Sequence, residues 1–262
     1  MVDTGRTPSV QVVSRDNPLV KQLRRLSEHG TAYRKQGQFW IEGEHLCHAA
    51  MEHKLRPSSL VVAQSHLSRV PPLWTQAAAR TVVLTDALFD GISGLESPAR
   101  VGFVMDLPEP VEARAGCATV VLDRIQDAGN VGSILRSAAA FGFLQVLALQ
   151  GTAGLWSPKV LRAGMGAHFG LDLAEGLGIS TVLATGLPLV VTSSHHGADL
   201  HHTRLPRPCA WVFGHEGQGV DPALMQHAGV SVRIPQPGGG ESLNVAAAAA
   251  ICLYASGLVA LQ

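Results

Sequence analysis

The sequence lacks paired cysteines. Its four cysteines, Cys47, Cys117, Cys209 and Cys252, are scattered along 262 residues, and no two of them have the Cys-x-x-Cys spacing. This arrangement argues against a disulfide framework and against a zinc site built on cysteine. It is typical of a protein of the cytoplasm, where thiols stay reduced, and we expect a cytoplasmic location.

The sequence also lacks long apolar runs. Its N-terminus has no apolar segment of the kind that opens a secretory signal, and no run reaches the ~20 residues needed to cross a bilayer. We therefore expect neither export nor a membrane partner. Hydrophobic residues make up 46% of the chain and charged residues 15%, which argues against disorder. The length and this composition suffice for the hydrophobic core of one large domain or of two smaller ones.

The chain carries no net charge, so its overall balance does not point to nucleic acid. The distribution is uneven, because seven basic and only two acidic residues lie between Arg6 and Lys35. A solvated helix face is the ordinary explanation of such a cluster. Contact with RNA is the other explanation that it allows.

The first part of the chain, residues 1–106, predicts a small α/β unit. Helical patterns and short apolar strands mix along it. The stretch from Met105 to Gly116 carries two prolines and several charges, which favours a linker at 107–116. The expected helices are at 18–26, 44–53 and 75–79, and the expected strands at 39–41, 59–62 and 81–84.

From residue 117 to 262 the predicted strands and helices alternate. Apolar strands interleaved with helices predict a mostly parallel sheet that is covered on both faces. Ligands of such sheets bind beyond the carboxyl ends of the strands. The expected helices are at 131–141 and in the alanine-rich C-terminal stretch, and the expected strands are at 119–122, 145–149, 188–192, 210–213 and 230–234.

The segment 234–245 joins a Pro- and Gly-rich backbone to an alanine-rich helix. Ser242 and Asn244 stand at this junction, where a helix leaves its first N–H groups unpaired. The bare amides and the two polar side chains could hold a ligand. Ser and Asn are also ordinary capping residues, so this segment taken alone leaves both interpretations open.

Two other segments follow predicted strands in the same way. In 122–142, Asn130 stands where a helix begins and Arg136 lies inside that helix; in 212–220, three glycines surround Glu216. Each of these residues has an ordinary explanation beside the functional one. Asn130 could cap its helix, Arg136 could be a surface residue with a buried stem, and Glu216 could stabilise its turn.

Two rival sites fit the pattern poorly. Gly129 and Gly132 do not form the G-x-G-x-x-G fingerprint of a dinucleotide fold, and no P-loop lysine is present. The histidine pairs at 195–196 and 201–202 have no carboxylate or cysteine partner at a ligand spacing, so we expect no metal site.

Taken together and in order, the three segments resemble the motifs of the SpoU (TrmH-type) family of RNA ribose 2′-O-methyltransferases, in the SPOUT class. The matching stretches are Asn130 to Arg136, then 214–219, then 234–245, and residues 157–162 also resemble the family. The likeness covers about 117–262. Residues 14–21 and 39–43 resemble the start of the ribosomal-RNA branch over a shorter length.

The resemblance implies a fold and partners that pattern analysis alone does not provide. The fold would be a C-terminal SPOUT domain with a trefoil knot, preceded by an L30e-like domain that binds the RNA substrate. The implied cofactor is S-adenosylmethionine. The implied partners are structured RNA and a second copy of the chain, in a homodimer whose active site spans both subunits, and no DNA partner is implied.

The resemblance also implies roles for particular residues. Arg136 would activate the 2′-hydroxyl, with a substrate phosphate as the suggested helper, because an arginine is a poor base by itself. The residues implied to position Arg136 and the RNA are Asn130, Glu216, Ser242 and Asn244. The residues implied to bind the cofactor are Thr192, Gly214, Gly219, Ile234 and Leu243.

We therefore predict methyl transfer to a ribose 2′-hydroxyl of structured RNA, most consistent with 23S-type ribosomal RNA. The same chemistry on transfer RNA is one alternative, against which the N-terminal unit argues. A catalytically inactive RNA-binding or ribosome-assembly protein is a second, and the intact motif residues argue against it. A nucleotide-dependent oxidoreductase is disfavoured by the missing fingerprint.

Overall fold

The computed structural model describes residues 9–193, 197–238 and 242–258. The chain divides into two compact units. The first contains Met1–Pro108 and also Trp156–Phe169, and the second contains Glu109–Leu155 and Gly170–Gln262. Residues 156–169 lie in the second half of the sequence but pack with the first unit, whereas the sequence pattern places them in the second.

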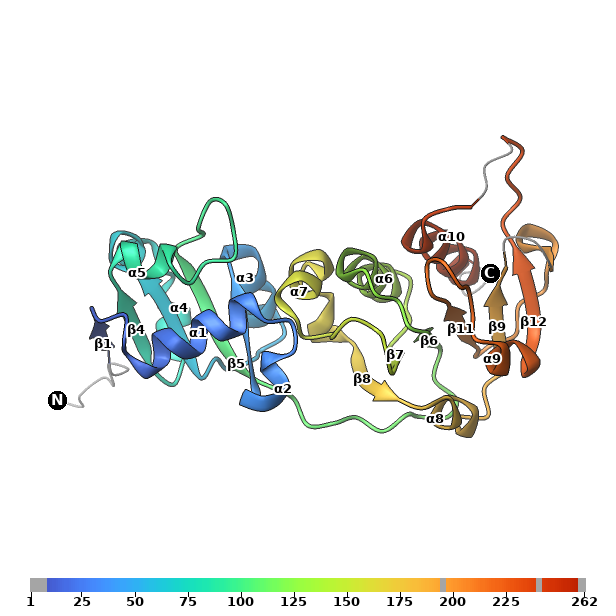
Figure 1. The fold of residues 1–262 in the computed structure, drawn as a ribbon, viewed down its shortest axis with the longest axis horizontal. Coiled ribbons are helices and arrows are strands. Elements are labelled where there is room, and N and C mark those ends of the chain that lie inside the picture. Colours follow the sequence, from blue (N-terminus) through green and yellow to red (C-terminus); the bar gives the residue numbers. More distant parts are fainter. Residues whose placement is uncertain (1–8, 194–196, 239–241, 259–262) are drawn as a thin grey trace. The chain divides into compact units, whose positions relative to one another are not determined.

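The first unit is built on a five-stranded sheet with the order β1-β4-β3-β5-β2, in which β5 runs antiparallel to both of its neighbours (Figure 1). Its elements are β1 (Ser9–Val12), α1 (Pro18–Glu28), α2 (Ala32–Gln36), β2 (Gln38–Glu42), α3 (Glu44–Glu52), β3 (Ser59–Ala63), the 3-10 helix η1 (Gln64–Arg69), α4 (Pro72–Ala77), β4 (Thr81–Leu84), α5 (Asp86–Asp90), β5 (Val101–Asp106), α7 (Pro158–Gly164) and the 3-10 helix η2 (Ala167–Gly170).

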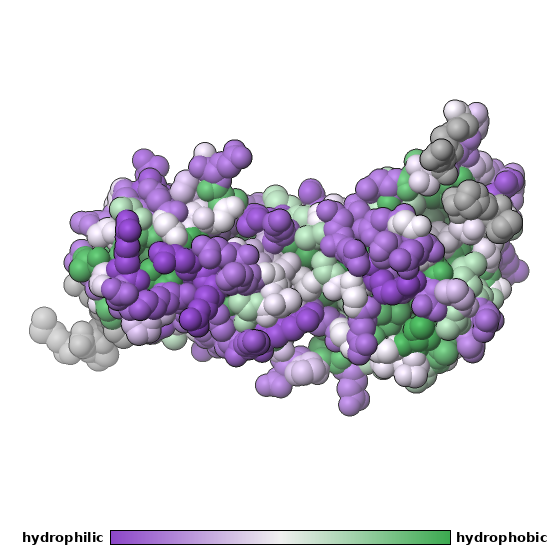
Figure 2. Space-filling model, viewed as in Figure 1, coloured by the Kyte–Doolittle hydropathy of each residue, from purple (hydrophilic) through white to green (hydrophobic). Residues whose placement is uncertain are grey.

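Helix α1 shows why the basic N-terminal stretch folds as it does. Asn17 caps it by accepting a hydrogen bond from the amide of Leu19, and Pro18 occupies the first helical position. One face is apolar and buried, whereas Lys21 and Arg25 are exposed on the other. Hydrophilic side chains cover the visible face of α1 (Figure 2). The basic side chains of α1 are therefore wholly or partly exposed to solvent, and Arg6 of the basic cluster lies outside the described residues.

Strand β5 is missing from the elements expected from the sequence, and so are β1, β8 and β10. Strand β5 ends at Asp106, directly before the linker expected at 107–116. At Gly102, a Cβ atom would overlap the Trp40 ring and the carbonyl oxygen of Ile41, so the tight pairing with β2 needs glycine there. A glycine inside a short apolar run weakens the strand signal in sequence, although it permits this approach.

The second unit has a seven-stranded sheet with the order β10-β12-β9-β11-β6-β7-β8. All of its strand pairs are parallel, as the sequence predicts. Its elements are β6 (Thr119–Leu122), α6 (Ala128–Ala140), β7 (Gln145–Leu149), β8 (Asp172–Leu177), α8 (Ile179–Ala184), β9 (Leu189–Thr192), β10 (Ala198–Asp199), the 3-10 helix η3 (Leu200–His202), β11 (Ala210–Phe213), α9 (Pro222–Gln226), β12 (Ala228–Arg233) and α10 (Val245–Leu258).

Both faces of this sheet are covered, because successive strand residues point to opposite sides. Val121 and Val212 belong to the core cluster that also contains Val182 of α8 and Leu224 of α9. On the other face, the indole nitrogen of Trp211 donates to Ser256 Oγ of α10 over 2.7 Å. Helices α6 and α10 lie side by side there (Figure 1). The second unit is thus a three-layer α/β/α fold.

Helix α6 begins earlier than the sequence predicts, which changes the role of Asn130. Helix α6 begins at Ala128 and not near 131, because Asp127 Oδ1 accepts the amide of Asn130 over 2.7 Å and so caps the helix. Asn130 is therefore inside the first turn, and the capping explanation of Asn130 is wrong. Its side chain is left for other contacts.

Among the described residues, no helix is long and apolar enough to span a membrane. All four cysteines are free, and burial raises the pKa of Cys209 to about 11 and that of Cys252 to about 12. The trefoil knot stays a prediction of the family resemblance.

Candidate active site

A pocket lies beyond the carboxyl ends of β9, β11 and β12, where parallel sheets bind ligands. All five residues predicted to bind the cofactor line it, together with Glu216 and Ser242. The complete lining is Thr192, Ser193, Gly214, His215, Glu216, Gly219, Val220, Ile234, Gln236, Ser242, Leu243, Val245 and Ala248. The sequence motifs assign no role to Ser193, His215 or Gln236.

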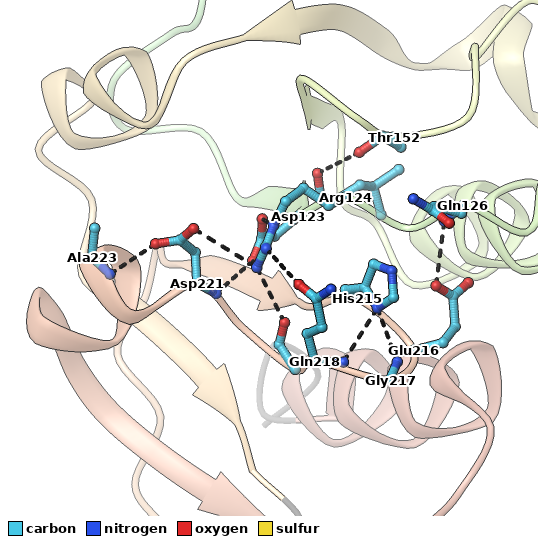
Figure 3. Close-up of polar contacts among 12 residues, drawn as sticks. Asp123, Arg124, Gln126, Thr152, His215, Glu216, Gly217, Gln218, Asp221 and Ala223 are labelled. Atoms are coloured by element: carbon cyan, nitrogen blue, oxygen red, sulfur yellow. Dashed lines mark hydrogen bonds and ion pairs between the residues drawn. The ribbon is translucent and has the colours of Figure 1, made fainter.

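One wall of the pocket is a closed glycine loop after β11. His215 and Gly219 exchange backbone hydrogen bonds of 3.0 and 2.8 Å, and His215 Nδ1 accepts the amides of Gly217 and Gln218. A Cβ atom on Gly214 would overlap the backbone of Gly219 and Val220, so this position must be glycine. Figure 3 shows the His215 ring over the amides that it holds.

Three predicted positioning residues form one polar cluster beside the pocket. Glu216 Oε1 accepts the side-chain amide of Asn130 over 3.1 Å, and Asn130 Oδ1 in turn accepts the side-chain amide of Asn244 over 2.9 Å. Asn244 Oδ1 also accepts the amides of Ala246 and Ala247, so Asn244 caps α10 while it belongs to the cluster. Capping and site geometry are therefore compatible in this residue.

Glu216 also ties the glycine loop to the start of α6. Its carboxylate accepts the backbone amides of Gln126 and Asp127 at 3.3 and 3.2 Å. Desolvation acts to raise the pKa of Glu216, but the hydrogen bonds from Asn130 and from these amides outweigh it and lower the pKa below its usual value. Glu216 is therefore a firmly ionised acceptor that orients Asn130.

Arg136 does not join this cluster. It is exposed on α6, and within the described part of the chain it makes no hydrogen bond or ion pair. At about 100° per residue, it lies about 240° around the helix from Asn130. The guanidinium is therefore free to meet a group that the single chain does not supply.

An ion-pair network that the sequence motifs do not predict lies behind the glycine loop. Asp123 and Arg124 follow β6 directly and reach Gln218, Gly219 and Asp221 (Figure 3). Hydrogen bonding to Asp123 raises the pKa of the Arg124 guanidinium. The feature of the sequence that could have indicated this network is an acidic residue followed by a basic one directly after the predicted strand 119–122.

The structure offers no metal centre in its described part, where no group of three or more His, Cys, Asp or Glu side chains could hold an ion. His201 and His202 are exposed in η3. The pair at 195–196 lies outside the described residues.

Two family models match the chain. Residues 118–254 match the SpoU rRNA Methylase family, and residues 17–102 match the MRM3-like substrate binding domain. The first match covers the seven-stranded sheet, most of α10 and every residue of the pocket. The second covers most of the five-stranded unit.

Individual proteins resemble the chain over nearly its full length. The 23S rRNA (guanosine(2553)-2′-O)-methyltransferase RlmP of Bacillus subtilis is 31% identical over 248 residues, which are 93% of this chain and 98% of that protein. The 23S rRNA (uridine(2479)-2′-O)-methyltransferase of Streptomyces viridochromogenes is 27% identical and covers 95% of this chain and 92% of its own.

A solved structure agrees with the sequence comparison. The AdoMet-bound rRNA methyltransferase of Sinorhizobium meliloti superposes with a TM-score of 0.83 at 26% identity and covers 97% of this chain and 99% of its own. The fold, the order of the three motifs and the family match agree. The chain therefore belongs to the SpoU rRNA methylase family.

Proposed function

We propose that this protein transfers a methyl group from S-adenosylmethionine to a ribose 2′-hydroxyl of ribosomal RNA of the 23S type. The observation that carries the proposal is the pocket at the strand ends, where the family's three motifs meet and where Asn130, Glu216 and Asn244 are joined by hydrogen bonds. The near full-length likeness to two 23S rRNA methyltransferases supports the choice of RNA.

The lining of the pocket fits S-adenosylmethionine. This lining combines apolar residues such as Leu243 and Val245 with Gly214 and polar residues, a composition that suits an adenine ring and its hydrogen-bonding edge. Thr192 and Gly219 would complete the cofactor site. When bound, the cofactor supplies a methyl group on a positively charged sulfur, and no metal is needed for its transfer.

The polar cluster would orient the substrate. Ser242 lines the pocket, and Asn130 and Asn244 hold each other through their amides, so these groups would fix the ribose and its phosphate in line with the methyl group. Arg136 would meet the 2′-hydroxyl and, with a substrate phosphate, help to remove its proton. An arginine stays protonated in ordinary surroundings, so the phosphate would take part in that step.

The exposed position of Arg136 supports a homodimer in which each active site uses residues of both subunits. Two exposed apolar side chains on α10 support the same arrangement: Ile251 is 42% exposed and Tyr254 52%. Apolar side chains that gather on one helix face favour a protein partner. A second copy that covers these two side chains would bring its own α6 near.

The five-stranded unit would hold the RNA. It matches a substrate-binding domain, and Lys21 and Arg25 of α1 are exposed cations that suit a phosphate backbone. The place of action would be the cytoplasm, where ribosomal RNA is modified.

A transfer assay tests the proposal. Purified protein with S-adenosylmethionine should methylate a 23S rRNA transcript or ribosomal precursor at one ribose, read as a 2′-O-methyl stop in reverse transcription, and should leave transfer RNA unmodified. Methylation of transfer RNA alone would favour the tRNA alternative, and RNA binding without transfer would favour the assembly protein. Calorimetry that detects a dinucleotide but no S-adenosylmethionine would overturn the proposal.

A further inference from the structure

The side chain of Arg124 is held by the carboxylate of the residue that precedes it, Asp123. The guanidinium makes two hydrogen bonds to this carboxylate, from Nε to Asp123 Oδ1 over 2.8 Å and from Nη2 to Asp123 Oδ2 over 3.1 Å. Asp123 is only 1% exposed, whereas Arg124 is 29% exposed. A buried carboxylate thus fixes the direction of a partly exposed guanidinium.

From that position Arg124 reaches the back of the glycine loop. Its Nη1 donates to Gln218 Oε1 over 3.1 Å and its Nη2 to the carbonyl oxygen of Gly219 over 3.4 Å (Figure 3). Asp123 Oδ2 accepts the amide of Asp221 over 2.6 Å. The pair therefore holds residues 218–221 at both ends, and Gly219 lines the pocket.

The backbone of Arg124 has a left-handed conformation, with φ at 59°. Such a conformation is unfavourable for a residue with a Cβ atom and would suit glycine. A strained conformation is kept only where the surrounding structure demands it, and it often marks a functional site. Here the strain aims the side chain at the loop.

We propose that Arg124, oriented by Asp123, is a positioning residue that holds the 218–221 segment in the shape that binds S-adenosylmethionine. This inference rests on the proposed function, because it requires that the pocket bind that cofactor. Arg124 acts through Gln218 and Gly219. Its loss should weaken cofactor binding and leave the transfer step itself largely intact.

The variant Arg124→Gly separates this role from a merely structural one. Glycine adopts the left-handed conformation without strain, which offsets part of the cost of leaving the buried Asp123 carboxylate unpaired. The variant should therefore fold, with a melting temperature close to that of wild type. Loss of hydrogen bonds to a charged group should raise the Kd and KM for S-adenosylmethionine about tenfold, with kcat within about twofold of wild type. In Arg124→Lys, which keeps a single charged donor, both constants should lie between those of wild type and glycine.

Arg100→Gly is the matched control. Arg100 is also left-handed, with φ at 62°, and is also paired with acids, Asp86 and Asp90, but it belongs to the five-stranded unit. Its variant should bind S-adenosylmethionine as wild type does.

Two results would overturn the inference while the proposed function stands: wild-type cofactor affinity in Arg124→Gly, or a loss of kcat that follows a loss of melting temperature. If the wild-type protein binds no S-adenosylmethionine, the proposed function fails and the inference falls with it.

Discussion

At the scale of single residues, Asn130 connects the segments that form the site. Its side-chain amide donates to Glu216 and its side-chain oxygen accepts from Asn244, so one residue links the ends of two strands to the start of α10. Only an amide side chain of this length offers a donor and an acceptor on one planar group. Glu216 accepts and never donates when ionised, which decides which way the Asn130 amide must face.

The substitution Asn130→Asp tests this link. It preserves the shape but replaces the donor with a second carboxylate beside Glu216, so the two like charges repel and the cluster opens. We expect methyl transfer to fall at least about a hundredfold, because misplaced substrate groups lose the benefit of orientation. Single-turnover transfer measures this. Asn17→Asp is the control, because Asp caps helix α1 as well as Asn does; wild-type transfer in Asn130→Asp would contradict the prediction.

The lowered pKa of Glu216 predicts a pH dependence of stability. A carboxyl whose folded-state pKa lies below the ordinary 4.5 stabilises the fold above that value, and the contribution is lost as the pH falls through the folded-state pKa. Glu216→Gln lacks this contribution. Its melting temperature should therefore lie below that of wild type at pH 7, and the difference should shrink as the pH falls below 4.5. A constant difference across that range would contradict the prediction.

At the scale of elements, helix α10 has a buried face that packs inside its own unit and an exposed face. Its small buried residues, such as Ala249, let it pack closely against α6, and Cys252 and Leu253 continue that face. Its other face exposes Ile251 and Tyr254. The alanine run predicts the tight packing, whereas the exposed face is visible only once the partner of the buried face is known.

The exposed face of α10 predicts the site of dimer contact. In Ile251→Glu, a charge would have to be buried without a partner on association, which costs several kcal/mol. We expect the proposed dimer to weaken by at least about a hundredfold, measured by sedimentation across a concentration series. Met225→Glu is the control, because Met225 is 36% exposed on α9 and should leave association unchanged. An intact Ile251→Glu dimer would place the interface elsewhere.

At the scale of the whole molecule, the position of Arg136 predicts an active site shared between two copies. Mixing Arg136→Ala and Asn130→Asp protomers forms hybrids in which one site has an intact Arg136 facing an intact Asn130 cluster, while the other site lacks both. With random exchange, half of the dimers are hybrids with one site of two, so activity should return to about a quarter of wild type. No recovery on mixing would mean that both residues serve one site from the same chain.

The sequence by itself determined much of this protein. Strands such as 81–84, 119–122 and 145–149 coincide with the observed β4, β6 and β7, and the alternation of strands and helices correctly predicts the parallel sheet. Residues after strand ends were expected to meet, because parallel strands present their carboxyl ends at one edge. Asn130, Glu216 and Asn244 do meet there.

Only the tertiary structure decided how those residues are held. Arg124 contacts Gln218 across 94 positions of sequence and does so from a left-handed backbone, which no local pattern reveals. The assignment of residues 156–169 to the first unit likewise depends on packing between distant segments. Local sequence encodes the periodicity of hydrophobic residues and the ends of helices and strands. The partner of each side chain depends on which distant surfaces are complementary in the folded chain.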